Sequence, residues 1–94
     1  MFANAQILAR KNPDTFHAPS DEDLGNIVVG SFVKVCYELP PPETGERFWA
    51  IVLEVCGGTI TAKVDNLLLC APFRVGEIII FEKKHVYDVM NSMK

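Results

Sequence analysis

Three consecutive isoleucines, Ile78 to Ile80, place the strongest constraint on how this chain can fold. Successive side chains of a β-strand point to opposite faces of the sheet, so this segment presents isoleucine on both faces. The chain has 94 residues, enough for one domain with one hydrophobic core. The sequence therefore predicts that apolar side chains on one face of a sheet lie outside that core and need another surface to cover them.

The chain from Ser31 onward has the pattern of a small, mainly β domain. Short apolar segments recur there, several of them alternate with polar residues, and turn-forming residues separate them. We therefore predict strands over residues 31–39, 47–55, 59–65, 67–71 and 77–82, and a short terminal strand after a turn within residues 83–89.

The connections between these strands carry their own signals. Gly57-Gly58 predicts a two-residue hairpin turn in which both glycines have positive φ. Three consecutive prolines at residues 40–42 predict an exposed loop, because proline cannot enter a central strand. Closely spaced short strands favour a small five- to six-stranded β-barrel, since closure removes exposed sheet edges.

Residues 1–30 differ from the rest of the chain and form an N-terminal extension to the domain of residues 31–90. Residues 1–12 predict a short helix that Pro13 ends. A turn-rich stretch follows, and then Ser20 is placed to cap a single helical turn that begins with three acidic residues. We expect the extension to be ordered and to cover one end or one face of the barrel.

The composition is that of a folded protein, with 49% hydrophobic and 22% charged residues. The chain has no apolar run near the length of about 18 residues that a membrane span needs, and no secretory signal is evident. We therefore predict a cytoplasmic protein that does not enter a membrane. The net charge of −3 disfavours nucleic acid as a partner, because nucleic-acid-binding domains usually carry a basic excess.

Three cysteines, an odd number, argue against a framework of disulfide bonds. Cys36, Cys56 and Cys70 each lie in an apolar run, where a free thiol behaves as a small hydrophobic side chain. We predict that all three are buried and reduced, which fits a reducing compartment. No pair has the spacing of a zinc-binding motif, and we expect neither a metal site nor a cofactor.

The sequence carries none of the motifs on which common catalytic sites are built. It lacks GxSxG, HExxH, a phosphate-binding P-loop and a glycine-rich dinucleotide turn. Catalysis needs a nucleophile with an orienting base, paired carboxylates or a metal. We therefore predict that the protein is not an enzyme and has no catalytic residues.

The strand predicted over residues 47–55 supplies the first candidate site. Alternation places its odd-numbered residues on one face and its even-numbered residues on the other. Tryptophan and arginine are the residue types that most often dominate protein interfaces, so we predict a partner-binding face here. An alternative is that Trp49 packs beneath the N-terminal helix. The residues of the predicted face are Arg47, Trp49, Ile51 and Leu53.

A second candidate site would bind a small ligand through polar groups. Asp65 and Asn66 follow a predicted strand and could orient such a ligand, although the same residue types also form turns by bonding their own backbone. Residues 83–85, Lys-Lys-His, form a basic cluster that could meet phosphate or could be a solvated turn. The predicted ligand pocket consists of Arg47, Trp49, Asp65, Asn66 and His85.

Several motifs carry a resemblance to a known family. They are GERFW before a strand, VDN after the hairpin and GE before IIIF, and with NPDTF and VGSFVKV they span about residues 12–89. On these motifs the chain resembles a domain-of-unknown-function family of small bacterial and phage proteins that look like SH3-type barrels. The resemblance implies a partly open SH3-like β-barrel with a one-turn helix before the last strand, and it assigns no activity and no catalytic residue.

The chain departs from that family at the outward positions of two strands. These positions tend to be polar in the family, whereas here they are Ile51, Leu53, Ile78 and Ile80. The departure favours a non-enzymatic module that binds a protein partner or a second copy of itself. The alternative function is a sensor or sponge for a small ligand such as a nucleotide, of bacterial or phage origin. A flat apolar surface around Trp49 favours the first function, and a closed concavity with convergent polar groups favours the second.

Overall fold

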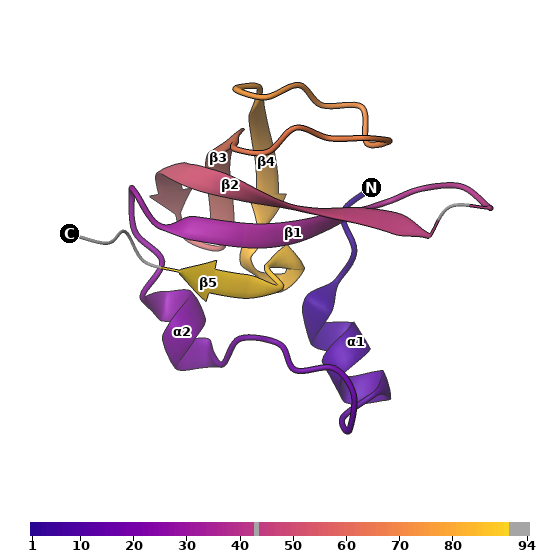
Figure 1. Cartoon of the computed structure of the whole chain (residues 1–94). Coiled ribbons are helices and arrows are strands. Elements are labelled where there is room, and N and C mark those ends of the chain that lie inside the picture. The colour runs from indigo at the N-terminus through magenta and orange to yellow at the C-terminus, as the bar shows by residue number, and fades with distance from the viewer. Residues whose placement is uncertain (43, 91–94) are drawn as a thin grey trace.

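The computed structural model describes residues 1–42 and 44–90. Within these residues the fold is mainly β: five strands form one antiparallel sheet in the order β4-β3-β2-β1-β5 (Figure 1). A one-turn helix, η1 (Lys83–His85), precedes the last strand, as expected. The strands are β1 (Phe32–Glu38), β2 (Gly45–Cys56), β3 (Thr59–Val64), β4 (Ile78–Glu82) and β5 (Asp88–Met90).

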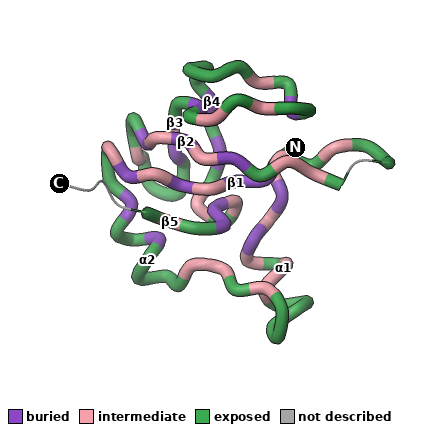
Figure 2. Tube along the Cα trace, in the orientation of Figure 1, coloured by how far each residue is buried: buried purple, intermediate pink, exposed green. Residues whose placement is uncertain are grey.

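One face of this sheet carries the hydrophobic core. The core side chains come from alternate positions of β1 to β4, which confirms the alternation predicted for β2 and β3 (Figure 2). Because these residues are mostly β-branched or aromatic, they suit both the pleated backbone and a packed interior. The buried residues of these four strands on this face are Val33, Val35, Phe48, Ala50, Val52, Ile60, Ala62, Val64, Ile79 and Phe81.

The apolar run at residues 67–71 does not form a strand, so that prediction is wrong. Leu67 and Leu69 are 83% and 89% exposed, whereas Leu68 and Phe73 pack against the core from the long loop between β3 and β4. Both sides of β3 are already paired, with β2 and β4, and the Glu46 carboxylate accepts the backbone N–H groups of residues 69–71 that a strand would offer to a neighbour. The proline-rich loop is exposed at Pro40, Pro41 and Pro42, as predicted; Glu43 lies outside the described residues.

The first helix, α1 (Ala5–Lys11), begins later than predicted. The Asn4 side chain accepts the N–H of Ile7 at 3.1 Å and so caps the helix, and the prediction of a helix from residue 1 is wrong. The residues before Asn4 extend beside β1 instead. The Ala3 N–H donates to the Cys36 carbonyl at 2.9 Å, and Phe2 forms a β-bridge with Tyr37.

The second helix, α2 (Asp21–Gly25), is the short acidic helix that the sequence predicts. The Ser20 hydroxyl accepts the N–H of Asp23 at 3.1 Å, and the acidic first turn complements the helix dipole. Leu24 of this helix is buried in the core, so α2 ties the N-terminal extension to the sheet. In the described part of the chain, no helix has the length and apolar composition that crossing a membrane requires.

The burial predicted for the three cysteines is correct for only one of them. Cys36 is buried, whereas Cys56 and Cys70 are exposed, and all three are free thiols. Cys56 is the last residue of β2, beside the hairpin turn, and Cys70 lies on the β3–β4 loop. An apolar sequence context does not bury a side chain where the backbone turns at the surface.

The turn between β2 and β3 uses its two glycines differently. Gly57 has a φ of 61°, in the left-handed region, whereas Gly58 does not have a positive φ. The prediction of positive φ at both glycines is therefore wrong. A hairpin turn with positive φ only at its first central residue has the φ pattern of type II′, which also follows the right-handed twist of the strands.

Gly57→Ala should lower the free energy of unfolding by about 1–2 kcal/mol, because an L-residue carries this cost in the left-handed region. Gly58→Ala is the matched control: an added Cβ meets no heavy atom within 4 Å at either position, so the variants differ chiefly in φ. The control should change stability by less than about 0.5 kcal/mol. Urea unfolding of the three proteins measures both effects, and equal losses would contradict this account of the turn.

Candidate interaction surface

The sheet face opposite the core, hereafter the outer face, carries a row of mostly apolar side chains. Cross-strand neighbours share a face, so the register of the strands fixes which outer side chains lie side by side. Phe32 of β1 is opposite Met90 of β5 on one side and Ile51 of β2 on the other. Ile51 is in turn opposite Lys63, and Lys63 is opposite Ile78 of β4. The row therefore crosses all five strands with one charged member.

Further apolar side chains flank this row. Ile80 is opposite Thr61, and Leu53 lies at the register shift of β2, where the strand bulges. Ile80 is 64% exposed, Ile78 is 52% exposed and Ile79 between them is buried, as the run of three isoleucines predicts. The apolar residues of this face, hereafter the outer apolar stripe, are Phe32, Trp49, Ile51, Leu53, Ile78, Ile80 and Met90.

The N-terminal helices pack elsewhere and leave the outer apolar stripe uncovered. α1 contacts η1. Figure 1 shows that α1 and α2 both lie on the β5 side of the sheet. The extension packs partly into the main core, through Leu24 and Ile27, and no stripe residue belongs to that core. Its other packing is a second cluster that also contains no residue of the stripe. Its buried members are Ala3, Ala5, Cys36 and Tyr87, with Leu8, Phe16 and Ala18 packed against them.

The predicted partner-binding residues of β2 lie on this outer face. Arg47 is exposed and Trp49 is half-buried, with Lys34 Nζ 5.1 Å from the centroid of the Trp49 ring. The backbone N–H of Trp49 donates to Asn66 Oδ1, and the backbone N–H of Asp65 donates to the Trp49 carbonyl at 3.0 Å. Asp65 and Asn66 thus extend the pairing of β2 and β3 by bonding Trp49 of the neighbouring strand, rather than by bonding their own backbone in a turn.

His85 lies on the core side of the sheet, away from the outer face. Its Nδ1 accepts the N–H of Glu82 at 3.0 Å, and its ring is 6.0 Å from that of Phe2, which packs against the core. Burial is the main reason why the pKa of His85 is lowered, and a neutral ring keeps Nδ1 able to accept. Lys84 beside it forms an ion pair with Glu82 at 3.6 Å. The fold therefore separates His85 from the other residues of the predicted ligand pocket.

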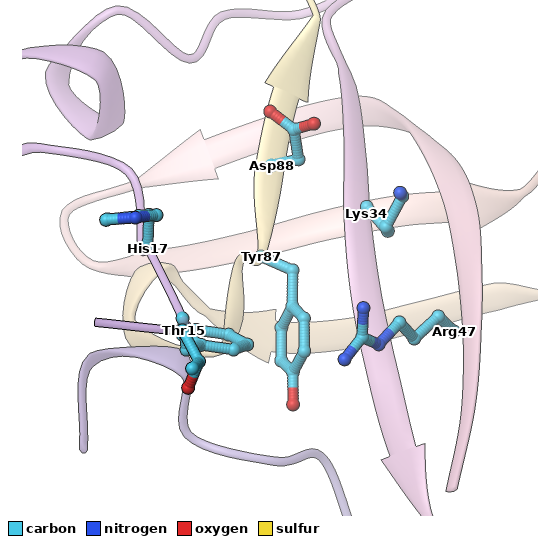
Figure 3. Close-up of a pocket in the computed structure, with 7 residues that line it drawn as sticks. Thr15, His17, Lys34, Arg47, Tyr87 and Asp88 are labelled. Carbon is cyan, nitrogen blue, oxygen red and sulfur yellow. The ribbon is translucent and has the colours of Figure 1, made fainter. Parts of the chain in front are cut away.

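A cavity lies on the outer face where β1, β2 and β5 meet the N-terminal extension (Figure 3). Tyr87 stands at its centre, with Thr15 and His17 on one side and Lys34 and Arg47 on the other. The Arg47 guanidinium carbon is 5.1 Å from the centroid of the Tyr87 ring, and the Phe16 ring meets Tyr87 edge-on at 5.0 Å. We call this space of about 310 Å³ the Tyr87 cavity; its other lining residues are Thr15, His17 and Asp88.

Sequence reasoning found only Arg47 among the residues of this cavity. Tyr87 and residues 15–17 come from segments far apart in the chain, and only the packing of the extension against β5 brings them together. The one available signal was the alternation of β1, which places Lys34 on the face opposite Val33 and Val35.

Glu46 is a second important residue that sequence reasoning missed. Its carboxylate accepts the N–H groups of Leu69, Cys70 and Ala71, each at 2.7 Å, and so fastens the β3–β4 loop to the start of β2. These hydrogen bonds, that from Leu69 above all, lower the pKa of Glu46. The available signal was the position of Glu46 in β2. Residues 46, 48, 50 and 52 share the face that packs on the core, and Glu46 is the charged member of that series.

Comparison of the chain with protein-family models, with curated proteins and with solved structures finds no match. The resemblance to a bacterial and phage family therefore stays a prediction, and the function has to be inferred from the geometry of the surface. Within residues 1–42 and 44–90, no group of three or more His, Cys, Asp or Glu side chains is placed to hold a metal ion.

Glu46→Gln should lower the free energy of unfolding by about 1 kcal/mol near neutral pH, because the three hydrogen bonds would no longer be made to a charged carboxylate. The loss stays this small because the carboxylate is partly exposed to solvent, which weakens such bonds. A carboxylate with a lowered pKa stabilises the fold above its unfolded pKa and loses that contribution as pH falls through its folded pKa. The difference between wild type and variant should therefore shrink as pH drops below the ordinary value of 4.5.

Urea unfolding near neutral pH and at about pH 3 measures this difference. Glu54→Gln, at an exposed position of the same strand, is the matched control and should have little effect at either pH. A loss in Glu46→Gln that stays the same at the lower pH would contradict the role assigned to the carboxylate.

Proposed function

We propose that this protein is a non-enzymatic binding module whose outer apolar stripe binds a protein partner or a second copy of the chain. The observation that carries the proposal is the exposure of large apolar side chains along one sheet face, with Trp49 at one end. Soluble monomers rarely expose apolar patches larger than a few hundred Å² that have no binding role. Lys63 and Thr61 of β3 interrupt the stripe between β2 and β4, and its other members lie on neighbouring strands. The surface is built on four strands of one sheet, so its side chains are held in place before any partner arrives.

The energetics favour an interaction of modest strength. Full burial of a large aliphatic side chain contributes about 1.5–3 kcal/mol, and the stripe residues are already partly covered, so each would contribute about 1 kcal/mol. An interface takes side chains from both partners, so burial would contribute about 14 kcal/mol in total. A cost in the lower part of the range of about 4–15 kcal/mol, for freedom lost on association, then leaves a net of about 7–10 kcal/mol. Trp49, with Arg47 beside it, supplies the residue types that usually add most to an interface. We therefore expect dissociation constants in the micromolar range.

The proposal includes an SH3-like fold for the sheet and a cytoplasmic location. β2 pairs with β1 through its first half and with β3 through its second half, and a register shift between Val52 and Glu54 lies within the β2–β3 pairing. A bulge of this kind increases the local twist and helps a small sheet to curl around one core. The short helix η1 before β5 and the strand order support a partly open barrel. Three free thiols support a reducing compartment.

Sedimentation of wild type, Ile80→Glu and Ile51→Glu tests the self-association form of this proposal. Wild type at about 100 µM should sediment above the mass of its 10.5 kDa chain, because this concentration exceeds the expected dissociation constant. A buried glutamate in the interface is costly, so both variants should be monomers. Ile7→Glu, the same change at an exposed position of α1, is the matched control and should behave as wild type.

A wild type that stays at the mass of one chain contradicts self-association. The partner form is then tested by comparing the proteins that co-purify with wild type and with Ile80→Glu. Identical sets of bound proteins would contradict it, because the changed side chain lies within the proposed contact surface.

A further inference from the structure

We propose that the Tyr87 cavity binds a small oxyanion, the carboxylate or phosphate group of a small molecule, through Arg47 and Lys34. This goes beyond the proposed binding of a protein, because the cavity is built from the N-terminal extension and lies beside the outer apolar stripe. Its volume of about 310 Å³ is at the lower end of the range for small-molecule sites, which suits a small metabolite better than a peptide.

Two cations of the cavity have no anionic partner among the described residues. Among residues 1–42 and 44–90 the ion pair joins Lys84 to Glu82, and neither Lys34 nor Arg47 forms an ion pair with a described carboxylate. Asp88 is opposite Lys34 in the register, but its Oδ1 accepts the Val89 N–H at 2.8 Å and no ion pair forms. In a chain with a net charge of −3, this cavity therefore gathers more positive than negative charge.

Aromatic rings, rather than carboxylates, support both cations. The Arg47 guanidinium lies 5.1 Å from the Tyr87 ring and Lys34 Nζ lies 5.1 Å from the Trp49 ring. A ring face stabilises a cation without occupying its N–H donors, so these donors stay available to a ligand. The fork of donors on a guanidinium matches the paired oxygens of a carboxylate or phosphate.

The rest of the cavity is compatible with a ligand whose anionic group is attached to an apolar part, such as an aromatic ring. Burial above all, with smaller effects of Cys36 and of the Glu38 carboxylate, raises the pKa of Tyr87 to about 12. Its hydroxyl is neutral near pH 7, as an ordinary tyrosine is, and adds no negative charge. Phe16 packs edge-on to Tyr87 at 5.0 Å and adds an apolar ring to the lining of the cavity. A cationic ligand would instead face Arg47 and Lys34 without enough carboxylates to balance them.

The fluorescence of Trp49, the single tryptophan of the chain, reports on this site, because Lys34 lies over its ring. Sodium phosphate and sodium benzoate are the two probes, which separate a phosphate from a carboxylate ligand, and sodium chloride at equal ionic strength is the blank. At least one probe should give a saturable change below about 10 mM that the blank does not give. No saturable change with either probe overturns the proposal.

Variants then locate the binding. Arg47→Gln should weaken binding of the active probe at least tenfold, and Lys34→Gln, followed by NMR shifts of the Tyr87 and Asp88 amides, should also weaken it. Arg74→Gln, at an exposed arginine of the β3–β4 loop, is the matched control and should bind as wild type. Unchanged affinity in both cavity variants, each shown to be folded by its thermal transition, overturns the proposal.

The test is independent of the proposed protein-binding function. Ile80→Glu changes the outer apolar stripe and leaves the cavity residues in place, so it should retain full affinity for the active probe. Loss of association with retained anion binding supports both assignments. Anion binding that disappears in Ile80→Glu would overturn the assignment to the Tyr87 cavity.

Discussion

A chain of 94 residues that forms one sheet can place only one face of that sheet on a hydrophobic core, and this constraint governs the structure. The inward series of β1 to β4 fills that core, and the β3–β4 loop, Phe2 and Leu24 complete it. The loop reaches its position because Glu46 binds three of its backbone N–H groups. The chain thus uses its connections to finish one core, and the outer face keeps its isoleucines uncovered.

The N-terminal extension divides the outer face into two regions of different chemistry. Its apolar residues pack on Cys36 and Tyr87 at one end of the face, where Thr15, Phe16 and His17 also wall the Tyr87 cavity. None of the residues of this cluster belongs to the outer apolar stripe, whose member Trp49 lies under Lys34. A polar, partly enclosed space and an open apolar surface therefore lie next to each other, with the Lys34–Trp49 contact between them.

The sequence was sufficient to predict features that depend on periodicity and on local capping. The strands, their inward and outward residues, the Ser20 cap and the turn before β5 follow from nearest neighbours in the chain. It was insufficient where distant segments compete for the same place. The run at residues 67–71 looks like a strand, yet β3 has no free edge for it, and Cys70 on that run is exposed. Nor could spacing show that His85 faces the core or that Tyr87 meets Arg47.

The central claim is that the outer apolar stripe is open on a single chain and becomes covered only on binding. Methyl NMR with a soluble paramagnetic agent tests it most directly, because Ile78 and Ile80 alternate with the buried Ile79 on one strand. In dilute solution the agent should broaden the methyl signals of Ile78 and Ile80 and leave those of Ile79 and Ile60 sharp, and a bound partner or second copy should restore the first two. Protection of Ile78 and Ile80 equal to that of Ile79 in the dilute monomer would contradict the claim.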